Sequence, residues 1–411
     1  MTNARRSGGG RLGAAALSGA LACAAAGAAS AQTEADFRSC LAGLQRAAKA
    51  AGVSASTWRE HTAGLQPDMG VVARLDDQPE FRVPIWDYLA ALVDDERVAD
   101  GRRMLAEHRE TLAGVARRFG VDAETVVAVW GVESDYGRSF GRTPLVQSLG
   151  TLSCFGRRQA FFRGELFAAL RIVQGGHLQA QQLVGSWAGA FGHTQFMPST
   201  YERLAVDFDG DGRRDLVSTI PDALASTAHF LQKAGWRSAE PWGFEARLPA
   251  GFDLRGEGRR TKRPLSEWTS RGLRRADGSP LASGGLVPAT PAGLLAPAGP
   301  QGPAFLVLRN FDALFSYNAA ESYGLAIAHL SDRLRGGGEF ATPWPTDDPG
   351  LSRAERRELQ TLLIARGHDI GEVDGRLGER SRAAIRAEQQ RLGHDANGRA
   401  GRRLLQALRA G

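Results

Sequence analysis

The stretch VDAETVVAVWGVESDYGR, residues 121–138, decides how the rest of the chain is interpreted. Asp122 is expected to be the N-cap of a helix, because its carboxylate can accept hydrogen bonds from first-turn amide groups. The apolar residues that follow have the three- and four-residue spacing of a packed helix, and they are Val126, Val127, Val129 and Trp130. Gly137 is expected to end this helix.

Glu133 follows Val129 by four residues and Trp130 by three, so these side chains should lie along one face of the helix. A carboxyl group in apolar surroundings is disfavoured as an anion, and its pKa should rise. A raised pKa suits a general acid that works near neutral pH. The alternative is a solvated glutamate near the end of a surface helix, which is where most unpaired acids are found.

The composition is that of a soluble globular protein, and 411 residues are enough for two or three domains. The formal net charge is +6, but Arg5, Arg6 and Arg11 lie in a segment that we expect to be removed, which leaves about +3. So small an excess gives little attraction for a polyanion, and no nucleic-acid partner is expected.

The N-terminus has the composition of a secretory leader. A basic start, a run rich in Ala and Leu, and the small residues at 29–31 predict a signal peptide over residues 1–31 and a periplasmic protein. Alternatively, Cys23 in the sequence ALAC resembles a lipidation site, which would anchor the protein to the outer membrane as a lipoprotein. Membrane association is expected only in that case, because no later segment is long and apolar enough to span a bilayer.

Two cysteines, Cys40 and Cys154, remain after such a cleavage. In an exported chain they suggest a disulfide between the N-terminal helix and the segment after the Glu133 helix. The alternative is two separate buried thiols.

Helical periodicity recurs over residues 36–51, 101–119 and 157–174, so the fold should be mainly α-helical. Residues 245–308 are rich in Gly, Pro, Arg and Ser, and predict a small insertion of short strands and loops in the helical core.

Residues 185–200, GSWAGAFGHTQFMPST, predict a ligand surface. Gly and Ala let a backbone approach a ligand closely. The contacts on offer are a hydroxyl, an amide, an aromatic ring and a thioether, from Ser186, Gln195, Phe196 and Met197. A polar and aromatic lining suits pyranose rings, although a tight turn between helices is the alternative.

The acidic sequence DFDGDGRRD, residues 207–215, places acids and a glycine at the spacing of an EF-hand loop. The expected ligands are the carboxylates of Asp207, Asp209, Asp211 and Asp215 and the carbonyl of Arg213. Ser218 stands where an EF-hand has its bidentate Glu. We expect a structural Ca²⁺ and no organic cofactor, with a solvated turn as the alternative.

These motifs in this order resemble the membrane-bound lytic murein transglycosylase B family over roughly residues 37–334. The resemblance implies a core similar to goose-type lysozyme, with Glu133 as the catalytic acid and Asp222 as a later metal ligand. It also implies that a saccharide groove is lined by Tyr317, Asn318 and Tyr323. For these aromatic residues the alternative is a place in the core.

The C-terminal residues resemble a type 1 peptidoglycan-binding module of three short helices. Ser352 and Glu355 have the spacing of a capping box, and DGRLG at 374–378 forms a turn before the second helix. The predicted organisation is therefore a catalytic domain over residues 32–340, a linker over 341–351 and a peptidoglycan-binding domain over 352–411.

The family resemblance implies a lytic transglycosylase that acts on peptidoglycan glycan strands, with partners among cell-wall synthesis proteins. It would cleave the bond between N-acetylmuramic acid and N-acetylglucosamine and leave a 1,6-anhydro end, with Glu133 as acid and then base. Asp135 is not a second catalytic carboxylate, because residues two apart do not share a helix face. One alternative is a hydrolytic muramidase in which Glu80 or Asp87 supplies the second carboxylate. The other is a non-catalytic wall-binding scaffold.

Overall fold

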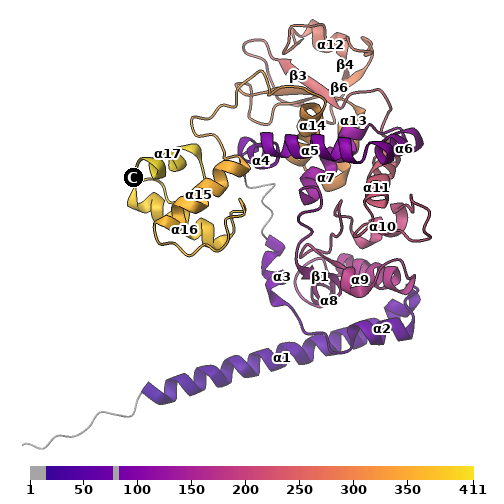
Figure 1. Cartoon of the computed structure of the whole chain (residues 1–411), viewed down its shortest axis with the longest axis vertical. Coiled ribbons are helices and arrows are strands. Elements are labelled where there is room, and N and C mark those ends of the chain that lie inside the picture. Colours follow the sequence, from indigo (N-terminus) through magenta and orange to yellow (C-terminus); the bar gives the residue numbers. More distant parts are fainter. Residues whose placement is uncertain (1–14, 77–82) are drawn as a thin grey trace, which may run out of the picture. The chain divides into compact units, whose positions relative to one another are not determined.

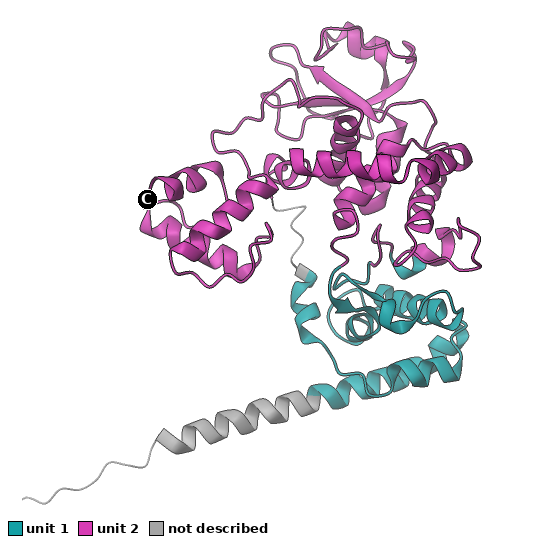
Figure 2. Cartoon of the chain, in the orientation of Figure 1, with its two compact units in different colours: residues 1–76, 141–190, 197–199 teal, residues 77–140, 191–196, 200–411 magenta. Residues whose placement is uncertain are grey.

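The computed structural model describes the backbone of residues 15–76 and 83–411, and within those ranges the side chains from residue 33 onward. The fold is mainly α-helical, as predicted (Figure 1). The chain divides into two compact units, residues 1–76, 141–190 and 197–199 in the first, and residues 77–140, 191–196 and 200–411 in the second (Figure 2). The predicted leader and lipidation site, including Cys23, and Glu80 lie outside the residues whose side chains are described.

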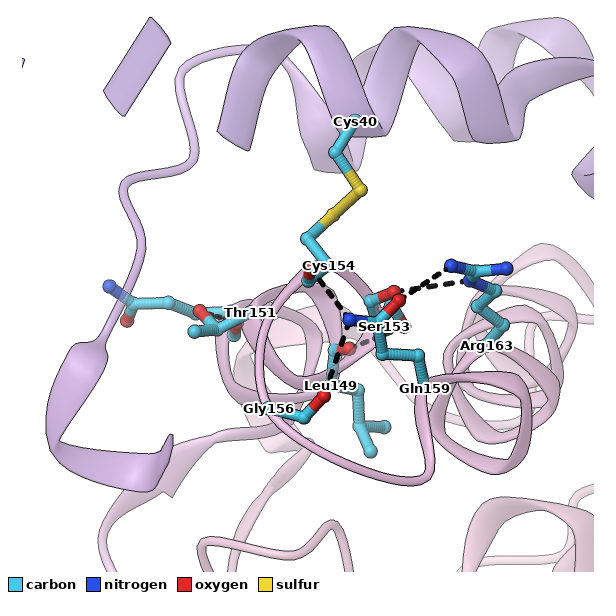
Figure 3. The surroundings of a disulfide bond; sticks show 9 residues. Cys40, Leu149, Thr151, Ser153, Cys154, Gly156, Gln159 and Arg163 are labelled. Atoms are coloured by element: carbon cyan, nitrogen blue, oxygen red, sulfur yellow. Dashed lines mark hydrogen bonds between the residues drawn. A yellow bond between two sulfur atoms is a disulfide. The ribbon is translucent and has the colours of Figure 1, made fainter. Parts of the chain in front are cut away.

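The first unit is built on helices that a disulfide joins. It holds α1 Ala15–Ala50, α2 Ala55–Thr62, α3 Met69–Ala73, α8 Leu145–Cys154 and α9 Gln159–Gln174, the 3-10 turns Arg74–Asp76 and Ala180–Gln182, and the antiparallel strands β1 Thr143–Pro144 and β2 Val184–Gly185. Cys40 on α1 is bonded to Cys154 at the end of α8, with the Cα atoms 5.9 Å apart (Figure 3). The side-chain amide of Gln159 donates to the Cys154 carbonyl over 3.1 Å, so the start of α9 lies next to the disulfide.

The helical core of the second unit surrounds α7. Its helices are α4 Ile85–Leu92, α5 Asp95–Glu107, α6 Arg109–Phe119, α7 Ala123–Ser134, residues 200–204 of α10 Pro198–Leu204, α11 Ile220–Lys233, α13 Arg309–Asn318 and α14 Glu321–Leu334. Residues 125–131 of α7 are all buried, and the helix packs against α5, α11 and α14. A helix that is apolar on every side is stable only inside a protein, so α7 becomes the centre of this core.

Three sequence predictions about these helices can be compared with the structure. Asp122 is the N-cap of α7, as expected, and accepts the Thr125 N–H over 3.1 Å. The end of α7 was predicted wrongly: the helix ends at Ser134, and Asp135 takes the left-handed conformation with φ 53°. The single helix predicted over 101–119 is also wrong, because His108 (φ −102°, ψ 25°) separates α5 from α6.

The predicted small β insertion is present in the second unit. It forms a five-stranded antiparallel sheet in the order β4-β6-β7-β3-β5, from β3 Gly243–Arg247, β4 Arg263–Pro264, β5 Arg274–Arg275, β6 Pro291–Leu295 and β7 Ala304–Val307, with helix α12 Leu265–Ser270. The sheet has its own apolar cluster around the buried Trp268.

The last residues form three helices, α15 Arg353–Ala365, α16 Glu379–Arg391 and α17 Arg402–Ala410. The capping box is confirmed, since Ser352 accepts the Glu355 N–H and the Glu355 carboxylate accepts the Ser352 N–H. Two buried glutamines fix the loops: Gln360 accepts the Gly375 N–H over 2.6 Å, and Gln389 accepts the Gly398 N–H over 2.8 Å. Each loop is thus held by a side chain of the helix before it.

Among the helices that the structure describes, none has both the length and the apolar character needed to cross a membrane.

Candidate active site

Glu133 is the penultimate residue of α7, where a buried helix reaches the edge of its core. Its side chain is half-buried, and the Tyr323 hydroxyl donates a hydrogen bond to its Oε1. Burial raises the pKa of Glu133 to about 8, while the hydrogen bond from Tyr323 acts to lower it. The carboxyl group is therefore mostly protonated at neutral pH, as a general acid must be.

Two tyrosines lie beside this acid. Tyr323 on α14 and Tyr317 on α13 are stacked, with ring centroids 6.2 Å apart, and Tyr317 donates to the Thr194 carbonyl over 2.7 Å. Burial raises the pKa of both hydroxyls well above their usual value, so both remain proton donors. Tyr317 and Tyr323 thus connect Glu133 to the loop over residues 191–196.

Phe196 is in the core rather than on a sugar-binding surface, which corrects the stacking role predicted for it. Its side chain is 1% exposed and leaves no ring face for a ligand. The ring packs against Tyr317 and Phe230, with centroid distances of 5.9 Å and 6.0 Å. Phe196 therefore supports Tyr317 from behind. Sequence alone could not distinguish an aromatic residue that lines a groove from one beneath it.

Gln195 lies in the same loop in a strained conformation. Its φ is 49°, which is uncommon for a residue with a side chain. Its amide Nε2 donates to the carbonyls of Gly192 over 2.9 Å and Phe140 over 3.3 Å, so the side chain is fixed by backbone acceptors. Strain of this kind is often found where a loop presents a side chain to a ligand.

His193 and its partners were missed by the sequence interpretation. The Trp130 Nε1–H donates to His193 Nδ1 over 3.0 Å, and Ser134 Oγ donates to the His193 carbonyl over 2.5 Å. Burial lowers the pKa of His193 to about 4, so the ring is neutral at neutral pH. A Cβ on Gly137 would lie 2.5 Å from this ring, so only glycine fits there. The sequence interpretation identified the motif around GHTQ but did not predict that its histidine, His193, contacts the helix of Glu133.

The remaining predicted substrate residues are not brought to Glu133 by these contacts. Ser186 and Met197 belong to the first unit, where Ser186 Oγ accepts the Ala190 N–H over 3.0 Å. Asn318 is the exposed last residue of α13.

Among the described residues, the carboxylates considered as partners for Glu133 are paired with arginines. Asp87 is held by Arg399, whose Nε and NH2 lie 2.6 Å and 2.8 Å from its two oxygens. Asp135 lies next to Arg97 and Arg353, at 3.5 Å and 3.0 Å. Among the described residues, no carboxylate contributes to the pKa shift of Glu133.

The acidic loop gathers three of the predicted metal ligands. Asp207, Asp209 and Asp211 each offer a carboxylate oxygen, and these oxygens lie within 4.8 Å of one another. Carboxylate oxygens are the ligands that Ca²⁺ prefers, so this part of the loop fits the ion. The backbone of the predicted ligand Arg213 is held here too, since its N–H donates to Asp211 over 2.7 Å.

Asp215 and Asp222 fix the backbone of this loop. Asp222 is fully buried, and its two oxygens accept the N–H groups of Phe208 and Asp215 over 2.7 Å and 2.8 Å. Asp215 accepts the N–H groups of Val217 and Ser218. Direct metal binding by these two acids stays a prediction. Asp215 uses only its Oδ1 for these backbone donors, and both oxygens of Asp207 accept backbone N–H groups as well.

Comparison with known proteins agrees with the fold and the motifs. The sequence model of the transglycosylase SLT domain matches residues 36–332, and that of a peptidoglycan binding domain matches residues 352–408. The membrane-bound lytic murein transglycosylase B of Escherichia coli K12 is 30% identical over 260 residues, or 60% of this chain and 66% of that protein. The chain thus spans just under two thirds of that relative.

Two solved structures are similar over most of the chain. SltB3 from Pseudomonas aeruginosa, in complex with NAG-anhNAM-pentapeptide, is 47% identical, with 91% of this chain and 99% of that chain covered and a TM-score of 0.73. The Escherichia coli lytic transglycosylase Slt35, in complex with calcium, is 27% identical, with 73% and 92% covered and a TM-score of 0.62. The predicted fold class, a lysozyme-like helical core with a small β insertion and a C-terminal helical module, is confirmed.

Proposed function

Because the chain belongs to the SLT transglycosylase family, we propose that it is a lytic transglycosylase that cleaves peptidoglycan between N-acetylmuramic acid and N-acetylglucosamine without using water. The observation that carries the proposal is the environment of Glu133. It is a carboxyl group with a pKa of about 8, hydrogen-bonded by one tyrosine and without a carboxylate partner among the described residues. One residue in this state can act as the acid and then as the base.

In the first step, the Glu133 proton passes to the glycosidic oxygen as the bond from that oxygen to C1 of the muramic acid breaks. The N-acetyl group of the same sugar stabilises the positive charge at C1. In the second step, the Glu133 carboxylate takes the proton of the 6-hydroxyl, and the O6–C1 bond forms. The proton count of the enzyme is restored, and the product is a 1,6-anhydro end.

Tyr323 donates a hydrogen bond to Glu133 in both steps. Its hydroxyl already donates to Glu133 in the protonated state, and this bond strengthens when the carboxyl group becomes an anion. The pKa of Glu133 therefore does not rise so far that the proton cannot leave. Tyr317 and Gln195, whose positions are fixed by hydrogen bonds to the 191–196 loop and its neighbours, present polar groups to the sugar. Asn318, Ser186 and Met197 stay predicted substrate residues.

The hydrolytic alternative has less support. The Arg399 guanidinium occupies both oxygens of Asp87, and Glu80 lies outside the described residues. A non-catalytic scaffold would not need a buried acid, and burying Glu133 with a raised pKa costs stability. In the proposed organisation, residues 32–340 form the catalytic domain and residues 352–411 bind the wall after a linker over 341–351.

The acidic loop would hold Ca²⁺ through Asp207, Asp209 and Asp211 and the Arg213 carbonyl, with Asp222 fixing the loop from within. A bound Ca²⁺ would offset two of the three negative charges of these acids and stiffen the segment before α11. It would take no part in the reaction. Export to the periplasm, with outer-membrane anchoring through Cys23 as the alternative, places the enzyme at its substrate.

The test is a digest of purified peptidoglycan by the full-length mature protein, read by mass spectrometry. The expected products are one water lighter than those of a muramidase. Glu133→Gln should abolish release while sedimentation of the protein with intact wall is retained. Products that carry the added water would show a muramidase, and unchanged release by Glu133→Gln would show that Glu133 is not the acid.

A further inference from the structure

Arg353, the first residue of α15, lies among carboxylates of α5 and the end of α7. Its guanidinium is 3.0 Å from Asp135, 3.4 Å from Asp100 and 4.0 Å from both Asp94 and Glu96. Its backbone N–H donates to Asp94 over 3.1 Å. The side chain is only 10% exposed, so these contacts are shielded from solvent.

Asp135 connects this cluster to the helix of Glu133. It follows Glu133 by two residues and ends α7 in a left-handed conformation, φ 53° and ψ 48°. This conformation costs free energy for a residue other than glycine, though less for Asp than for most, so neighbouring contacts help to hold it. Arg97 assists from the other side, with its NH1 donating to the Gly131 carbonyl over 3.1 Å and its NH2 3.5 Å from Asp135.

The charges of the cluster show why Arg353 is needed. Arg103 and Arg138 also contact its acids, but their side chains are 61% and 45% exposed, so solvent weakens their effect. Among the described residues of the catalytic part, Arg97 is then the one buried cation beside Asp94 and Asp135. Its side chain is 8% exposed. A buried carboxylate without a partner is strongly destabilising. Arg353 supplies the second buried cation.

Neighbouring contacts hold α15 in the same place. Arg357 is 2.5 Å from Glu96 on α5, and Arg356 donates to the Ala91 carbonyl of α4 over 3.0 Å. Arg399, in the loop before α17, binds Asp87 on α4 with two nitrogens. The C-terminal helices are thus fixed to α4 and α5 by several buried or half-buried arginines, and not only by the covalent linker.

We propose that Arg353 is a positioning residue for catalysis, through which the C-terminal domain holds the end of α7 and so orients Glu133. The domain would then complete the active site in addition to any binding of the wall. This inference rests on the proposed role of Glu133. Arg353 acts through Asp135 and does not touch the substrate, so its loss should affect turnover more than substrate affinity.

The experiment compares full-length Arg353→Ala and Arg353→Lys with wild type on a short soluble peptidoglycan tetrasaccharide. Arg353→Ala should lower kcat about ten- to a hundredfold with little change in KM, because small misplacements of a catalytic group have effects of this size. Arg353→Lys, which keeps the charge but not the planar fork, should restore part of kcat. Arg255→Ala, which removes an exposed ion pair with Asp253, is the matched control and should be unchanged.

Asp135→Asn keeps the inference testable if Arg353→Ala does not fold. It removes the acid that most requires Arg353, so Asp135→Asn alone should lower kcat, and the double variant should lose less than the product of the single effects. A wild-type kcat in a folded Arg353→Ala variant, or strictly independent effects in the double variant, would overturn the positioning role. Glu133→Gln separates the two proposals: its activity reports on the acid itself, whereas Arg353→Ala reports only on its support.

Discussion

Replacing Glu133 by Gln should make the protein more stable, and the gain should increase with pH. Burial raises the pKa of Glu133 from 4.5 to about 8 in the folded protein. Between those pH values the folded state binds a proton that the unfolded chain has released. The free energy of unfolding of the wild type must therefore decrease as the pH rises through this window. A glutamine does not titrate, and its carbonyl can still accept the Tyr323 hydrogen bond.

The size of the gain follows from the shift. Each pH unit between the two pKa values contributes about 1.4 kcal/mol, which gives an upper limit of about 3.5 kcal/mol at pH 7. At pH 5 the same calculation gives about 0.7 kcal/mol. Because the side chain is half-buried and keeps some contact with water, we expect a measured gain of about 1–3 kcal/mol at pH 7.

The assay is urea unfolding of wild type and Glu133→Gln at pH 5 and pH 7, followed by tryptophan fluorescence and far-UV circular dichroism. The two compact units of the chain need not unfold in one transition. The comparison therefore uses the unfolding transition whose midpoint differs between wild type and Glu133→Gln. Glu110→Gln, at an exposed glutamate in the first turn of α6, is the control for loss of a surface charge. A Glu133→Gln effect that is the same at both pH values, or a loss of stability at pH 7, would refute the reasoning.

Three further outcomes are expected. Tyr323→Phe removes the hydrogen bond that lowers the pKa of Glu133, so the alkaline limit of the kcat/KM profile should move upward and kcat should fall; an unmoved limit would contradict this role. Asp209→Asn should reduce the rise in Tm that Ca²⁺ produces in the wild type, as measured by scanning calorimetry; an undiminished rise would place the ion elsewhere. The double replacement Cys40→Ser/Cys154→Ser should cost about 2–5 kcal/mol of stability in urea unfolding. If reducing agent leaves the wild-type transition unchanged, the disulfide does not stabilise the unit.

The start of α7 was predictable because its signals are local. Asp122, the amides that it caps and the valines that follow lie within a few residues of one another. The end of α7 was not predictable. Gly137 is the residue that local chemistry favours for a left-handed turn, but the helix ends earlier, at Ser134, and Asp135 takes the left-handed conformation. Asp135 takes this conformation next to Arg353, which lies more than two hundred residues later in the sequence. A contact between residues so far apart cannot be predicted from local sequence patterns.

The acids of the metal loop illustrate a second limit of sequence interpretation. The EF-hand spacing predicted Asp215 as a ligand together with Asp207 and its neighbours, and the family resemblance added Asp222. In the structure, Asp222 is fully buried and accepts two backbone N–H groups, a role that no spacing rule distinguishes from metal binding. Phe196 shows the same limit for aromatic residues, since its motif was recognised correctly but its ring supports Tyr317 from the core.

The burial of α7 explains the raised pKa of Glu133 and gives the ion pairs at the ends of the helix a structural role. An apolar helix packed on every side raises the pKa of the acid at its end, but the valines along it offer no polar contacts to fix its position along its own axis. Its two ends supply those contacts: Asp122 pairs with Arg335 at the start, and Asp135 pairs with Arg97 and Arg353 at the finish. Charged groups just outside the apolar environment therefore help to hold the helix that carries the acid. The C-terminal domain contributes one of those groups.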